Sequence, residues 1–202
     1  TVQPDFIPPP EGPNVRLPKS KTKTLKPDAR QTLNFMIAKE GIRKKPYQDP
    51  SRKKSRKAIG PGLNYEQLPK KYQNIIKKAT NDLTTDLPDE VGIKVLGNII
   101  SDNNKRLKEL MKNSKVKFSD LTSAQKAAVA SLTVQLGFDG YTKGFSDSFK
   151  ALKAGDFEEA ARQLLRNAAD DGPSELLGDA ELRTKEVAKM IRTGKFQKNY
   201  GT

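Results

Sequence analysis

The feature that most constrains the fold is a series of apolar residues at helical spacing in the second half of the chain. From residue 87 onward, apolar side chains recur every three or four positions, as they do along one face of an α-helix. The segment 121–137, "LTSAQKAAVASLTVQLG", is apolar on more than one face, which indicates a buried central helix. Further amphipathic segments follow at 144–155, 156–169 and 180–194, and the first and last of these end in a glycine, which suits a helix stop. The pattern predicts a mainly α domain.

Proline and charge divide the first part of the chain. Residues 1–28 contain 7 of the 13 prolines, which disfavour helix and sheet, so we expect an extended linker or tail there and a domain over 29–202. A helix is expected from an N-cap at Asp28 to Gly41. Residues 43–57, "RKKPYQDPSRKKSRK", carry eight basic residues and one acid, and their two prolines favour a short hairpin or an irregular loop.

A second helix is expected within 64–79, "NYEQLPKKYQNIIKKA". It precedes the long amphipathic segment 87–113, which has Pro88 and two acids in its first turn, as helix N-termini prefer. Together with the small basic subregion, these helices make the expected fold class mainly α (α+β).

The composition excludes several kinds of site. The chain has no cysteine and no histidine, which excludes disulfides, thiolate ligands, imidazole catalysis and histidine-bound zinc. Acid–base chemistry then falls to carboxylates, lysine or tyrosine, and we expect neither a metal nor a cofactor. The net charge of +14 predicts attraction to polyanions such as nucleic acid, anionic lipid or an acidic cell envelope. No apolar run approaches the roughly 20 residues of a membrane-spanning helix, and no signal peptide is visible.

Two blocks of sequence resemble the phage-type lysozymes, the peptidoglycan-cleaving glycoside hydrolases of T-even phages and their relatives. In the first block, "MIAKEGIRKKPYQD", a helix ends in Glu-Gly-hydrophobic-Arg, and a Tyr-x-Asp places Asp49 nine residues after Glu40. "AIGPG" at 58–62 is similar to the family's Ile-Gly-x-Gly strand. In the second block, residues 124–168 resemble the family's buried central helix and the two helices after it, and "RTKEVAKMIRTGKF" resembles its closing helix.

The resemblance implies a bilobal domain with a small N-terminal hairpin lobe and a larger helical C-terminal lobe. It also implies that Glu40 protonates the leaving oxygen while Asp49 stays ionised on the opposite side of the sugar ring, with inversion at the anomeric carbon. Without the resemblance to this family, Asp49, which precedes Pro50, is interpreted as a plain turn residue. Gln135 falls at a cleft position of the family and is a candidate substrate contact; a satisfied amide at a helix end is the equal alternative.

The chain departs from the family pattern at two places. The family carries a threonine that lies both six residues after the aspartate and directly before the Ile-Gly strand. In this chain the residue six positions after Asp49 is Ser55, whereas the residue directly before the strand is Ala58. Ser55 is the candidate for the helper hydroxyl, and Ala58 in that place would leave none. Leu63 stands where the family has histidine. These departures bear on activity rather than on the fold.

The favoured function is therefore a phage-encoded muramidase that cleaves peptidoglycan. It would act from a virion or in the host periplasm or envelope, with residues 1–28 as an attachment to tail or other virion proteins. A catalytically weakened module that binds the wall or serves as a structural virion part is the alternative. Nucleic-acid binding ranks third, because the basic run 43–57 has a single aromatic residue and no stacking platform.

Overall fold

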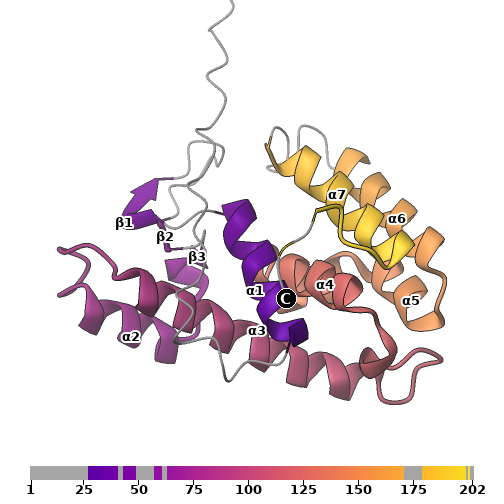
Figure 1. Ribbon diagram of the computed structural model, residues 1–202, viewed down its shortest axis with the longest axis horizontal. Helices are drawn as coiled ribbons and strands as arrows, with labels where there is room; N and C mark the ends of the chain where they lie inside the picture. Colours follow the sequence, from indigo (N-terminus) through magenta and orange to yellow (C-terminus); the bar gives the residue numbers. More distant parts are fainter. Residues whose placement is uncertain are drawn as a thin grey trace, which may run out of the picture.

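The computed structural model describes residues 27–40, 43–48, 57–60, 63–170, 179–198 and 200. Within these ranges the chain is mainly helical, which confirms the fold class expected from the apolar spacing (Figure 1). The helices are α1 (Pro27–Glu40), α2 (Lys70–Ala79), α3 (Asp89–Met111), α4 (Ser123–Gln135), α5 (Ser146–Ala154), α6 (Phe157–Asp170) and α7 (Asp179–Thr193). The shorter elements are the 3-10 turns η1 (Tyr65–Gln67) and η2 (Phe118–Asp120) and the π-helix η3 (Gly140–Gly144).

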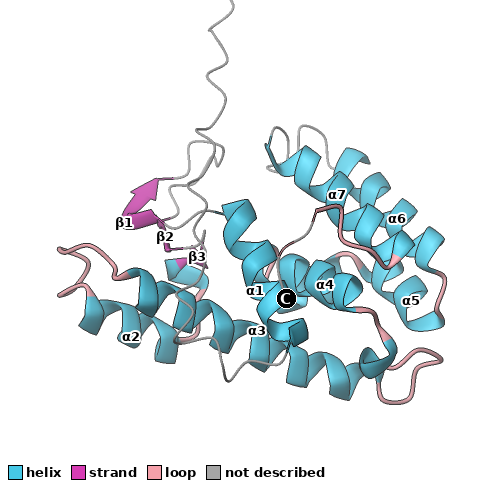
Figure 2. Ribbon diagram, in the orientation of Figure 1, coloured by secondary structure: helices cyan, strands magenta, loops and turns pink. Residues whose placement is uncertain are grey.

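A small antiparallel sheet lies beside α2 at one end of the molecule (Figure 2). Its strands, in spatial order, are β1 (Arg43–Gln48), β2 (Lys57–Gly60) and β3 (Leu63–Asn64). Pro46 lies within β1 although proline cannot donate a ladder hydrogen bond. It is accommodated because β1 is an edge strand whose register shifts between Arg43 and Tyr47, and edges and bulges are the places where sheets accept proline.

The long helix α3 spans the molecule, with α2 and the sheet towards one end and α5, α6 and α7 towards the other (Figure 1). The central helix is α4, where Ala127, Ala128, Val129 and Ala130 are fully buried, as its apolar composition predicts. Small side chains let neighbouring helices approach closely, and both α1 and α7 pack against α4. This arrangement places the end of α1 near the middle of the fold.

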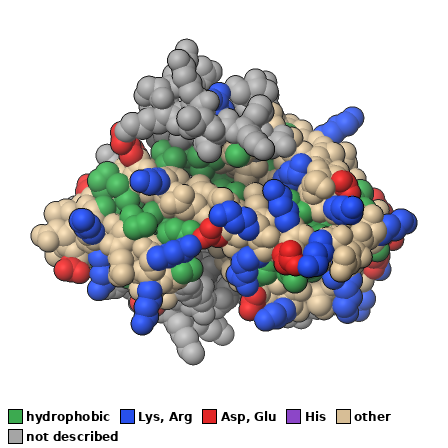
Figure 3. Space-filling view, turned by 90° about the horizontal axis from the view of Figure 1, so that it is seen from below, with side chains coloured by type: hydrophobic (Ala, Val, Ile, Leu, Met, Phe, Trp, Pro, Cys, Tyr) green, Lys and Arg blue, Asp and Glu red, His purple; other side chains and the backbone are tan. Residues whose placement is uncertain are grey.

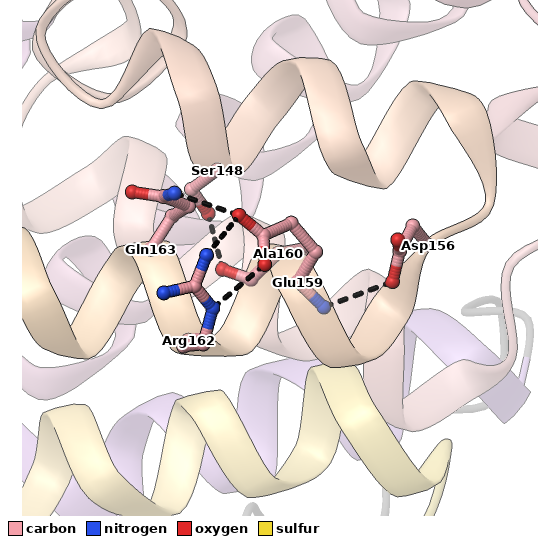
Figure 4. A network of polar contacts seen from close by, with 6 residues as sticks. All are labelled: Ser148, Asp156, Glu159, Ala160, Arg162 and Gln163. Carbon is pink, nitrogen blue, oxygen red and sulfur yellow. Dashed lines mark hydrogen bonds and ion pairs between the residues drawn. The ribbon is translucent and has the colours of Figure 1, made fainter.

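Helices α5 and α6 pack against each other, and α6 also packs against α7. The buried Ser148 hydroxyl of α5 donates to the Ala160 carbonyl of α6 at 2.8 Å (Figure 4). The Asp156 carboxylate accepts from the Glu159 backbone N–H at 2.9 Å and so caps the start of α6. Two guanidinium bonds from Arg162 lower the pKa of Glu159, which is therefore ionised in the first turn, where the helix dipole favours negative charge.

Helix ends largely follow the sequence. Gly155 and Gly194 end α5 and α7 with φ of +80° and +65°, a conformation that residues with a Cβ rarely adopt. Gly155 is also sterically required, because a Cβ there would lie 2.9 Å from the Val116 side chain. Two starts differ slightly from the expectation. Helix α1 begins at Pro27, one residue before the expected N-cap, and the helix expected within 64–79 is divided because Pro69 precedes α2.

A turn after α2 has a backbone that the sequence did not predict. Asn81, Asp82 and Leu83 have φ of 43°, 56° and 70°, and leucine is rarely left-handed. The buried Thr80 holds this turn: its hydroxyl donates to the Ile76 carbonyl at 2.8 Å and accepts from the Leu83 N–H at 3.0 Å. The local hydrogen bonds and the packing of Leu83 against the core offset the strain.

We therefore expect Thr80→Val to lower the free energy of unfolding by about 1–3 kcal/mol, because it leaves the half-buried Leu83 N–H without the acceptor that the buried Thr80 hydroxyl provides. Urea denaturation followed by circular dichroism measures this loss. Thr84→Val is the matched control, since the Thr84 hydroxyl also bonds a backbone carbonyl but is exposed. Equal small losses in both variants would show that the Thr80 hydroxyl does not hold the turn.

Candidate functional site

Glu40 is the last residue of α1, at the point where the chain leaves the helical core for the sheet. Leu33, Phe35, Met36 and Ile37 are buried, and they seat the helix against the core that includes α4. The first strand begins three residues later, at Arg43. The backbone thus carries Glu40 at the junction of helix and sheet; its side chain lies outside the described residues.

The segment after α7 returns to hold α1 in place. The rings of Phe35 and Tyr200 meet edge to face with centroids 5.2 Å apart, and Phe196 completes the cluster. The Asn34 amide donates to the Tyr200 carbonyl at 2.8 Å, and the Tyr200 hydroxyl donates to Glu186 of α7 at 2.9 Å. Burial and then this hydrogen bond raise the pKa of the Tyr200 phenol, so it remains a donor. The helix that ends in Glu40 is consequently tied to α7.

The sheet places some of the other candidate positions. Ala58 lies in β2, paired with Tyr47 on one side and with Asn64 on the other. Leu63, which the resemblance aligns with the family's histidine, lies in β3 and is buried, so this position belongs to the hydrophobic core. Asp49 and Ser55 fall between β1 and β2 and lie outside the described residues, as does most of the basic run 43–57. Their roles stay predictions.

Gln135 is the last residue of α4 and is half-buried beside Arg183 of α7. With its amide oriented so that donors meet acceptors, the side-chain oxygen accepts from the Arg183 guanidinium and from the Ser131 hydroxyl. Arg183 also donates to the buried Ser131 hydroxyl at 3.2 Å. The Gln135 oxygen therefore has partners inside the protein, as the helix-end interpretation expects, and any contact with a glycan stays a prediction.

Helices α4 and α7 are joined at both ends. The Gln125 amide near the start of α4 donates to the Ile191 carbonyl near the end of α7 at 2.9 Å. The Thr122 hydroxyl, the N-cap of α4, donates to the Gly194 carbonyl at 2.9 Å. The contact between Gln135 and Arg183 joins the opposite ends. Two antiparallel helices fixed in this way give Gln135 and Arg183 a rigid setting.

Arg183 was missed by sequence reasoning. It lies at the start of the "RTKEVAKMIRTGKF" segment, where an arginine in an amphipathic helix reads as a solvent-facing charge. Its contacts with Ser131, 52 residues away, and with Gln135 distinguish it from the surface lysines of the same helix.

Other features of the described residues lie apart from these positions. A shallow hollow of about 430 Å³ at the end of α2 is lined by Asn74, Lys77, Lys78, Asn81 and Asp82, and it includes none of the candidate residues. Within the described ranges, no cluster of three or more acidic side chains could hold a metal ion. None of the helices resolved there is both long and apolar enough to cross a membrane. Figure 3 looks onto the side of the molecule formed by α3 and shows lysine and arginine side chains along it, with fewer acidic ones between them.

Neither a protein-family model nor a curated protein sequence matches this chain.

Proposed function

We propose that this chain is a muramidase, a glycoside hydrolase that cleaves the glycan strands of bacterial peptidoglycan, encoded by a phage. The observation that carries the proposal is the position of Glu40 as the last residue of a helix seated on the core, directly before an antiparallel sheet. A sheet on one side of a helix end and a helical core on the other can hold a glycan chain between two groups of side chains. Such a division into two lobes is part of the proposal.

A glutamate at a helix C-terminus is better explained by chemistry than by stability. The helix dipole disfavours negative charge at that end, so an ionised Glu40 gains nothing from its helix. A neutral carboxyl carries no such penalty, and a partly desolvated position raises a carboxyl pKa enough for it to act as a general acid. Glu40 is accordingly assigned the role of proton donor to the leaving oxygen.

Asp49 is assigned the role of the ionised partner. Glycoside hydrolysis requires a second carboxylate that either activates water or stabilises positive charge at the anomeric carbon. Asp49 follows directly on Gln48, the last residue of β1, which pairs with Lys57 of β2. If water attacks and inverts the anomeric carbon, we expect the two carboxylates to have the wider of the two separations found in glycoside hydrolases.

A second candidate function is a lysozyme-like module that binds the cell wall, or serves as a structural part of the virion, with weakened catalysis. The observation that favours it is the burial of Leu63, because an apolar core residue in the family's histidine place can contribute nothing to proton transfer. Under either function, residues 1–28 would tether the domain to tail or other virion proteins, and its place of action would be the virion or the host periplasm and envelope.

The test is a sacculus-turbidity assay of the wild type with Asp49→Asn, Ser55→Ala and Ala58→Thr. We expect measurable lysis by the wild type and a loss of about a hundredfold or more in Asp49→Asn, which removes the charge facing the reacting carbon. Ser55→Ala should lower the rate further if its hydroxyl reaches the cleft, whereas Ala58→Thr should raise it if residue 58 holds that place. Lysis that survives Asp49→Asn would contradict the assignment of this residue. Absence of lysis in all four proteins would leave the wall-binding module as the function.

A further inference from the structure

We draw no further inference here: the strongest candidate, the shallow hollow formed by the end of α2 and the left-handed turn after it, carries nothing, because its Lys77 is already paired with its Asp82 and nothing in the described part of the chain shows what would fill it.

Discussion

Glu40→Gln is expected to abolish the cleavage of peptidoglycan glycan strands while leaving the chain folded. Without a proton donor, the leaving oxygen of the glycosidic bond departs as a poor alkoxide, and general acid catalysis is worth roughly 10²–10⁴-fold in rate. Glutamine keeps the size and hydrogen-bonding capacity of glutamate but cannot supply the proton. The expected loss is therefore at least about a hundredfold in the release of reducing ends from purified sacculi, with an unchanged thermal midpoint.

The matched control for this variant is Glu66→Gln, which makes the same exchange at an exposed position in η1, directly after the sheet. It should retain wild-type lysis because Glu66 lies on the surface. A robust wild-type activity that survives Glu40→Gln would show that another group donates the proton, and the assignment would be wrong.

Phe35→Ala is expected to have the largest effect on stability, a loss of about 3–5 kcal/mol in the free energy of unfolding. Phe35 is fully buried in α1, and its ring contacts those of Phe196 and Tyr200. Truncation removes both aromatic contacts and leaves a cavity between α1 and the segment after α7. Since small domains have roughly 5–15 kcal/mol of stability in total, this loss should appear as a large shift of the urea midpoint.

Leu110→Ala serves as the control for Phe35→Ala. Leu110 lies in the last turn of α3 with half of its side chain exposed, so truncation removes little buried area and alanine favours the helix. Its cost should stay below about 1 kcal/mol. A Phe35→Ala variant that loses no more than this control would mean that the cluster with Phe196 and Tyr200 does not fix α1.

Local pattern was enough to predict the helices of the second half of the chain. Apolar spacing and a closing glycine are properties of residues near one another in the sequence, and they correctly indicated α4 as the buried helix and the ends of α5 and α7. The end of α1 at Glu40 was predictable for the same reason, because Gly41 follows it.

Contacts between distant segments could not be predicted in this way. Asn34 meets the backbone of Tyr200 across 166 residues, and Arg183 meets Ser131 across 52, and no local pattern distinguishes these residues from other polar ones. The left-handed Leu83 even contradicts its local preference, and it is tolerated because Thr80 and the core hold it. The sequence therefore specified which segments become helices and which faces are apolar. The tertiary structure decided which side chains meet, because several helices must bury their faces against one another at once, and that packing determines the few long-range polar contacts that can form.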